Sequence, residues 1–144
     1  MDIAYTDIYD MCQDLSSFEG RRITNASGES MYSDVHITTQ DEPFVRTFVD
    51  EAVSLVHAAT RYAIRDVTRD TTKITFTPTA GSVLETSVNA KKVLTETLSM
   101  FVMRCWLEDK SAERSKAYGL MFDSMLASFV RLTYRKNAPN LSDY

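Results

Sequence analysis

Hydrophobic residues recur at helical spacing in four stretches of the chain, and these stretches define the expected core. The first stretch is residues 7–17, where apolar side chains stand at i, i+3, i+4 and i+7: Ile8, Met11, Cys12 and Leu15. Side chains with this spacing share one face of an α-helix. We therefore expect a short amphipathic helix that Gly20 brings to an end.

A loop is expected after this first helix. Residues 21–33 are rich in Thr, Asn, Ser and Gly and show no periodicity, which is typical of a surface loop. A brief extended piece follows and ends near residue 38. We expect residues 21–38 to form a loop or extended arm.

The second apolar stretch has the clearest helix start in the chain. Thr39 and Glu42 stand at the spacing of a capping box, and Pro43 fits the first turn, where no intrahelical N–H group is needed. The apolar residues expected on the buried face of this helix are Phe44, Phe48, Ala52, Leu55 and Ala59, flanked by Val45, Val49 and Val56. This helix should belong to the core.

Three arginines continue the spacing of the second helix beyond its apolar part. Arg61, Arg65 and Arg69 stand four residues apart, with Asp66 and Asp70 between them. One interpretation is a basic stripe that binds phosphate groups. The interpretation we favour is the solvated end of a helix, because the two acids would repel the phosphates that the arginines attract.

A β-strand is predicted for residues 73–79, where apolar and polar side chains alternate. Ile74 and Phe76 share one face of this strand. Residues 82–88 are placed to pair back on it, so we expect a β ribbon over residues 72–86. A ribbon of two strands is marginal in water, and it must pack on helices or take strands from another chain.

Two longer apolar stretches complete the predicted helices. The third helix is expected to begin near Ser87 or Asn89. Its apolar face is Leu94, Leu98, Phe101, Val102, Cys105 and Trp106. The fourth is expected to begin near Ser111. Its apolar face is Tyr118, Phe122, Met125, Phe129 and Leu132. Residues 108–111 between them form a connection short enough to force an antiparallel hairpin.

These elements predict a mainly α fold, namely a four-helix-bundle-like domain with a small β ribbon and an extended loop. We expect residues 1–144 to form a single domain, with a polar C-terminal tail at residues 137–144. A chain of 144 residues with 44% hydrophobic and 25% charged residues is ordinary for a globular domain. No segment approaches the roughly 18 apolar residues that a membrane span needs.

The net charge of the chain limits the classes of function that the sequence supports. The net charge of −4 argues against a protein whose main task is to bind nucleic acid tightly.

The sequence also offers little support for a metal site or an active site. His36 and His57 have no second His, Cys or acid at ligand spacing, which gives metal binding little support. The chain has four glycines, too dispersed for a phosphate-binding loop. Cys12 and Cys105 are isolated in apolar contexts and are expected to be buried thiols. We expect no enzymatic activity, no metal and no cofactor.

A second group of cations lies at the end of the fourth predicted helix. Arg131, Arg135 and Lys136 suit the negative pole of the helix dipole, which is the simpler interpretation. The alternative is a docking edge that faces an acidic neighbour or a nucleic-acid channel. The complete candidate interface is Arg61, Arg65, Arg69, Arg131, Arg135 and Lys136.

Two segments carry a family resemblance. The first, TTQDEPFVRTFVDEAVSLVHAATR, combines an acidic cap with an F-x-x-x-F helix. The second, SMFVMRCWLEDKSAERSKAYGLMFDSMLASFVRLTYRKNAP, is a hairpin that contains Trp and ends in R-K-x-A-P. This order resembles that of the head-to-tail connector and adaptor proteins encoded by tailed bacteriophages and prophages, especially of Bacteroides-type hosts.

The resemblance implies a virion structural protein that assembles in the host cytoplasm. Copies would form an oligomeric ring in the neck, between the portal protein and the tail components, with DNA passing through as cargo and no membrane involved. One alternative is a tail-completion protein. Another is a small helical protein-binding module with a groove along Tyr118, Phe122 and Met125. An enzyme is a third, and it would need Cys105 or His57 to be unusually reactive.

Overall fold

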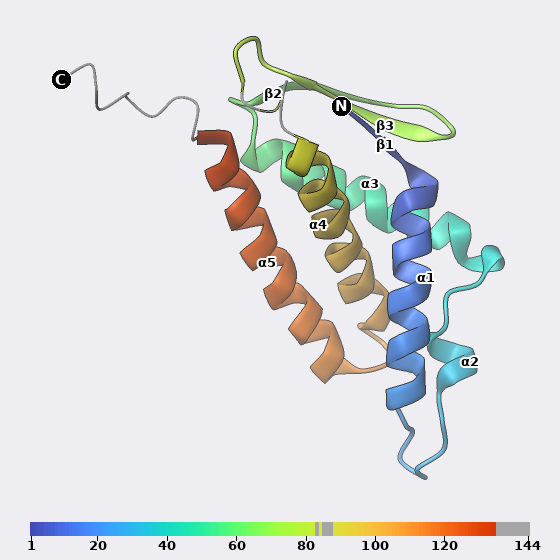
Figure 1. The fold of residues 1–144 in the computed structure, drawn as a ribbon. Coiled ribbons are helices and arrows are strands. Elements are labelled where there is room, and N and C mark those ends of the chain that lie inside the picture. The colour runs from blue at the N-terminus through green and yellow to red at the C-terminus, as the bar shows by residue number, and fades with distance from the viewer. Residues whose placement is uncertain (83, 85–87, 135–144) are drawn as a thin grey trace.

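The fold is mainly α, as the sequence predicts, and the structure is a computed structural model that describes residues 1–82, 84 and 88–134. Its long helices are α1 (Tyr5–Arg22), α3 (Glu42–Ala59), α4 (Val88–Leu107) and α5 (Ala112–Tyr134). Its short elements are α2 (Tyr32–Val35), the 3-10 turn η1 (Thr39–Asp41), β1 (Asp2–Ala4), β2 (Ile64–Arg69) and β3 (Lys73–Pro78). The strands form a small sheet at one end of the helices (Figure 1).

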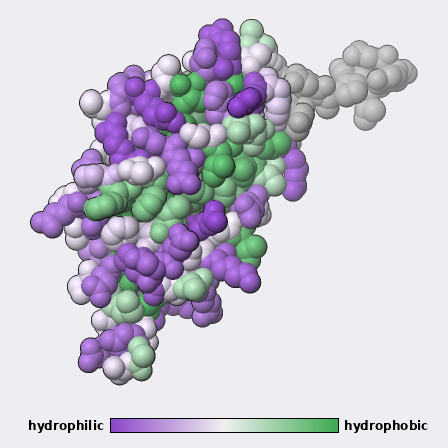
Figure 2. All heavy atoms as spheres, turned by 180° about the vertical axis from the view of Figure 1, so that it is seen from behind, coloured by the Kyte–Doolittle hydropathy of each residue, from purple (hydrophilic) through white to green (hydrophobic). Residues whose placement is uncertain are grey.

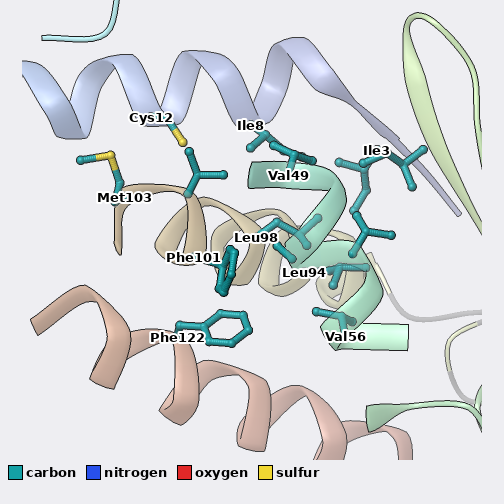
Figure 3. Close-up of a cluster of buried hydrophobic side chains, with 14 of the residues drawn as sticks. Ile3, Ile8, Cys12, Val49, Val56, Leu94, Leu98, Phe101, Met103 and Phe122 are labelled. Carbon is teal, nitrogen blue, oxygen red and sulfur yellow. The ribbon is translucent and has the colours of Figure 1, made fainter. Parts of the chain in front are cut away.

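α4 is the central helix of the fold. It packs on α1, α3 and α5, and α3 crosses behind it (Figure 1). Its apolar residues are therefore buried on several sides: Ala90, Leu94, Leu98, Phe101, Val102, Met103 and Leu107. Figure 3 shows Phe101 of α4 facing Phe122 of α5, with ring centroids 5.1 Å apart at 62°. This edge-to-face arrangement is favourable for aromatic rings.

α4 and α5 form the predicted antiparallel hairpin, joined by residues 108–111. The hydroxyl of Ser115 on α5 donates to the carbonyl of Arg104 on α4 at 2.8 Å, which fixes the first turn of α5 against its partner. No helix in the described part of the chain is long and apolar enough to cross a membrane.

The sheet is antiparallel with strand order β1-β3-β2. Ile74 and Phe76 on the central strand are fully buried, which confirms the predicted alternation. The partners of β3 both precede it in the chain, so the ribbon predicted over residues 72–86 has the wrong partner strand. Residues 83 and 85–87 of the expected returning strand lie outside the described residues.

α1 extends past Gly20, which therefore does not end the helix. A Cβ atom at Gly20 would lie 3.1 Å from Cδ2 and 3.2 Å from Cα of Tyr32. The glycine thus permits α2 to lie close against α1. Sequence alone indicates a helix stop here because glycine is common at helix C-termini.

The segment predicted as an extended arm, residues 21–38, is divided into an exposed turn at residues 24–30 and a second part, residues 31–38, that is anchored on the body. Thr24 and Ser30 form an isolated β-bridge that closes a turn. Val35 and Ile37 are both fully buried in the main core. Two apolar side chains in a polar stretch are enough to anchor the segment, because each buried side chain contributes roughly 1.5 to 3 kcal/mol.

The capping box lies one residue before the predicted one, and it caps the 3-10 turn η1 that leads into α3. The capping box is made by Thr38 and Asp41, whose carboxylate Oδ2 accepts from the backbone N–H of Thr38 at 2.9 Å. Pro43 lies in the first turn of α3, as expected.

The buried face of α3 also differs from the predicted one. Its buried residues are Val45, Val49, Ala52, Val53 and Val56. Phe44 is 62% exposed and Leu55 is 42% exposed, although both were expected in the core. α3 is apolar on two adjacent faces, and the valine face is the one that is fully buried.

Candidate interaction surface

An apolar surface lies where the first turns of α3 meet the last turn of α4. Its apolar residues are Phe44, Phe48, Cys105 and Trp106, and its charged residues are Asp41, Glu108, Asp109 and Lys110. The hollow between them has a volume of about 480 Å³. Together with Glu51 and Leu55 of α3, we call these residues the α3 surface. Figure 2 shows hydrophobic side chains gathered in a band across the face on which α3 lies.

Trp106 is held in a fixed orientation at this surface. Its Nε1 donates to the carbonyl oxygen of Val35 at 2.6 Å. Nζ of Lys110 lies 4.1 Å from the ring centroid and donates to Oδ1 of Asp109 at 3.1 Å. A cation over an indole face is favourable. An aromatic ring that is ordered in advance loses little entropy when a partner binds.

Two carboxylates of the α3 surface lack a partner. Glu51 on α3 and Glu108 after α4 make no ion pair or side-chain hydrogen bond with any residue that the structure describes. An exposed carboxylate beside apolar rings favours a partner that carries both apolar side chains and cations.

The same carboxylates act on Cys105. Burial, followed by the negative charges of Glu51 and Glu108 and opposed by Arg104, raises the pKa of the Cys105 thiol to about 11. The thiol is therefore protonated near neutral pH and is a poor nucleophile. Cys12 is buried, and burial raises its pKa to about 12.

A second apolar hollow, which we call the methionine groove, lies between α1 and α5 over α4. It is lined by Met11, Leu15, Glu96, Met100, Leu120, Met121, Ser124 and Met125, and its volume is about 530 Å³. Leu120 is 62% exposed. Methionine side chains are flexible and adapt to different partners.

The two surfaces lie on opposite sides of α4. Glu96 of the methionine groove and Cys105 of the α3 surface are nine residues apart on this helix. At about 100° per residue, this separation places them about half a turn apart. Figure 1 agrees, because α1 and α5 flank α4 in front while α3 crosses behind it.

The groove predicted along Tyr118, Phe122 and Met125 is wrong in two of its three residues. Tyr118 is 3% exposed and Phe122 is 4% exposed, so both belong to the core. Met125 alone borders an open surface, the methionine groove. The side chains of α5 that line the groove are Leu120, Met121, Ser124 and Met125.

The predicted stripe of three arginines is not helical. α3 ends before Arg61, while Arg65 and Arg69 lie on β2. Arg65 pairs with Asp66 at 3.3 Å, and Arg69 pairs with Asp50 of α3 at 3.3 Å. The β-branched residues of β2 pair with β3, and this pairing overrides the helical spacing of the cations.

Arg131 is exposed near the C-terminal end of α5, at the same end of the molecule as the start of β2. The hydroxyl of Tyr62 contacts the hydroxyl of Thr133, which joins these two regions. Arg135 and Lys136 lie outside the described residues. The structure therefore brings part of the predicted interface to one end of the molecule but does not form a continuous basic stripe.

Other polar clusters are occupied by contacts within the fold. The part of the chain that the structure describes holds no group of three or more His, Cys, Asp or Glu side chains that could bind a metal ion. The ring of His36 stacks on Tyr32 at 5.1 Å, and a ring nitrogen of His57 lies 3.2 Å from the carbonyl oxygen of Ile64. Glu19 is buried and is held by residues of α5. Each of these side chains contacts another part of the fold, although Nδ1 of His36 is buried without a hydrogen-bond partner among the described residues.

Comparison of the chain with the models of known protein families, with curated proteins and with solved structures gives no match. The resemblance to connector proteins thus stays a prediction. The α3 surface is not among the sites predicted from the sequence. Its signal was present, because α3 carries apolar residues over a wider arc than one neighbouring helix can cover.

Proposed function

We propose that the protein is a non-enzymatic structural subunit that assembles with copies of itself into a connector or adaptor ring of a tailed-phage neck. The observation that carries the proposal is the presence of two different apolar surfaces on opposite sides of α4. A ring needs this arrangement, because each subunit must present one surface to the copy before it and another to the copy after it.

The character of the two surfaces supports an assembly role. Exposed apolar patches of this kind are characteristic of protein interaction sites. The α3 surface presents Phe44 and Trp106, and aromatic side chains commonly supply most of the binding energy in interfaces. The methionine groove offers adaptable walls. In a closed ring, moderate contacts suffice because closure makes the last contact intramolecular.

The setting in a phage neck is supported by the resemblance of the two quoted segments. It assigns the portal protein and tail components as partners, DNA as cargo only, and the virion as the final location. The net charge of −4 is compatible with a channel through which DNA must slide without being gripped. A tail-completion protein would use the same surfaces and is the nearest alternative.

The proposal is tested by the mass of the full-length chain in solution. Light scattering coupled to size-exclusion chromatography, over a range of concentrations and with the candidate portal protein of the same genome, should reveal a discrete oligomer or complex. Leu120→Asp should abolish it with little change in thermal stability, because Leu120 is 62% exposed.

Ala127→Asp provides a matched control for that variant. Ala127 is exposed on the same helix but does not line the methionine groove. Its replacement should leave assembly intact. A strictly monomeric chain, alone and with the portal protein, would overturn the proposed function.

A further inference from the structure

We propose that the α3 surface of one copy docks into the methionine groove of a second copy. This inference rests on the proposed self-assembly and names the contact that produces it. Each copy gives its α3 surface to one neighbour and receives the α3 surface of another neighbour in its groove. Such a head-to-tail contact produces a ring when its rotation closes.

The two surfaces have complementary shapes, a ridge and a groove. Four residues of the α3 surface stand at i, i+4, i+7 and i+11 along one face of α3, namely Phe44, Phe48, Glu51 and Leu55. The methionine groove is a hollow over α4 with walls on α1 and α5. A helix with apolar residues at this spacing commonly binds in a groove of this kind.

The contact also gives a partner to the large apolar side chains that the fold leaves exposed. Within the described part of the chain, such side chains occur in two groups. Those on or next to α3 are Phe44, Leu55 and Tyr62, and those on or next to the groove are Phe18, Leu120 and Met121. Docking of the first group on the second removes apolar surface of both copies from water at once.

The charge of the α3 surface changes along the helix. Asp41 and Glu51 make its first part acidic. Arg61 is exposed and stands two residues past the end of α3. It forms no ion pair or side-chain hydrogen bond with any residue that the structure describes. The surface is therefore acidic at the start of α3 and basic at its end.

The methionine groove is acidic near the start of α1. A neighbouring hollow at this end shares Met11 and Glu96 with the groove. The charged residues of that hollow are three acids and two lysines, namely Asp7, Asp10, Glu96, Lys91 and Lys92. The acids therefore exceed the cations by one charge.

The other end of the groove is basic. Arg22 lies in the last turn of α1, with its guanidinium carbon 5.2 Å from the ring centroid of Phe18. Phe18 follows Leu15 by three residues and so borders the groove. The hollow beside Leu120 on the α5 side contains two cations and two acids, namely Arg104, Lys116, Glu108 and Asp123. These four charges balance, so Arg22 leaves this end with an excess of positive charge.

The charges of the two surfaces are spaced alike. Glu51 and Arg61 are ten residues apart, which corresponds to roughly 15 Å along a helix. Asp10 and Arg22 are twelve residues apart on α1, or about 18 Å. When α3 runs antiparallel to α1 of the second copy, opposite charges face each other at both ends. The parallel arrangement would bring like charges together, which is costly at an interface.

A second copy is favoured over the chain's own C-terminal residues as the partner of α3. Residues 135–144 can reach α3, because the hydroxyl of Tyr62 just past α3 contacts the hydroxyl of Thr133 in α5. Their order of charge does not match that of α3. The cations of the segment come first, beside Arg61, and Asp143 comes near its end, toward the acidic part of the α3 surface. Like charges would then meet at both ends.

The test measures self-association of the full-length chain by sedimentation velocity over a range of concentrations. One variant combines Glu51→Lys with Arg61→Glu, and another combines Asp10→Lys with Arg22→Glu. Each exchanges the charges at the two ends of one surface and leaves the net charge at −4. Each should weaken self-association by about tenfold or more, because like charges then face each other. All four side chains are exposed, so circular dichroism should show an unchanged fold.

Recovery separates recognition from structural damage. The chain with all four substitutions should associate as the unchanged chain does, because both orders of charge are reversed together. An equimolar mixture of the two double variants should also associate, because each variant then meets neighbours that match both of its surfaces. Glu29→Lys combined with Arg131→Glu is the control, since both side chains are exposed and neither lines the two surfaces. This control should associate normally.

The outcomes distinguish this inference from the proposed function. If the chain forms oligomers that do not respond to either exchange, or that do not recover in the combined variant and the mixture, the inference is wrong and self-assembly stands. Arg135→Glu combined with Lys136→Glu should leave association unchanged, and a tenfold loss would overturn the inference as well. If association follows the charges but yields open filaments, the contact is supported and the ring is not. A chain that stays monomeric at every concentration contradicts both.

Discussion

Arg114 holds Glu19 with two parallel hydrogen bonds, from Nε to Oε2 at 2.9 Å and from Nη2 to Oε1 at 2.8 Å. Glu19 is only 1% exposed, and the hydroxyl of Tyr118 donates to its Oε1 at 3.0 Å. The pair joins the end of α1 to the start of α5. It therefore sets the separation of the two helices that form the walls of the methionine groove.

Removal of Arg114 should be strongly destabilising. Arg114→Ala leaves the Glu19 carboxylate buried without its cation, and such a loss reduces the free energy of unfolding by about 3 kcal/mol. Urea denaturation measures the change. Arg65→Ala removes an exposed pair with Asp66 and should alter stability by less than about 0.5 kcal/mol. Equal losses in the two variants would contradict a structural role for the Glu19 pair.

Tyr118 should make the fold sensitive to alkaline pH. Burial, followed by the charge of Glu19, raises the pKa of Tyr118 to about 12. The pKa of a tyrosine in an unfolded chain is about 10, so the folded state binds the hydroxyl proton of Tyr118 more tightly than the unfolded state does. Its contribution to stability is complete below about pH 10 and is lost as the pH rises toward 12.

The matching measurement compares the unchanged chain with Tyr118→Phe. The free energy of unfolding should fall more steeply from about pH 10 to pH 11 in the unchanged chain, because only that chain loses the proton of Tyr118 on unfolding. Parallel pH profiles for the two proteins would show that Tyr118 does not contribute.

Two helical glycines should respond to alanine with opposite signs. Alanine favours a helix over glycine by about 1 kcal/mol. At Gly119, the nearest neighbour of a new Cβ is Cδ of the flexible Arg104 side chain at 3.3 Å, so Gly119→Ala should stabilise the protein. At Gly20, the new Cβ would lie 3.2 Å from the backbone Cα of Tyr32, and Gly20→Ala should destabilise it. Thermal unfolding of both variants gives the signs, and a stabilised Gly20→Ala would show that α2 moves freely.

Alanine substitutions at Leu98 and Phe44 should affect different properties. The first should reduce stability, and the second should reduce self-association. Leu98 is fully buried, and Leu98→Ala should lower the free energy of unfolding by roughly 2 to 5 kcal/mol. Phe44 is 62% exposed, and Phe44→Ala should change it by less than about 0.5 kcal/mol. Sedimentation velocity should nevertheless show weaker self-association for Phe44→Ala by about tenfold, as expected for an aromatic anchor. A large loss of stability in Phe44→Ala would place its ring in the core.

The long helices and their hairpin were predictable because each carries several turns of apolar periodicity. The strand partners were not. β1 has three residues, too few for a pattern, and β2 carries charged side chains that hide its alternation. Both strands form because their backbones pair with that of β3. For β1 this pairing joins distant parts of the chain, which local sequence patterns do not reveal.

The candidate surface was predictable only in part. The sequence identifies α3 as strongly apolar, but it does not reveal which of two neighbouring arcs packs on α4, because the crossing of the two helices decides this. Phe44 was therefore placed in the core and Val49 beside it, the reverse of their actual burial. The free carboxylates of Glu51 and Glu108 carry no local signal, since an exposed glutamate on a helix is ordinary.

The pairing of β1 with β3 determines the order in which the fold can close. α4 and α5 are neighbours along the chain, whereas Asp2 on β1 and Lys73 on β3 are 71 residues apart. Contacts over such separations form late, because closing a long loop loses more chain entropy than a local turn does. During translation, Ile3 must wait for Ile74 to leave the ribosome before the two can pair. β1 thus reaches its native place only after the 70 residues between Ile3 and Ile74 have been synthesised.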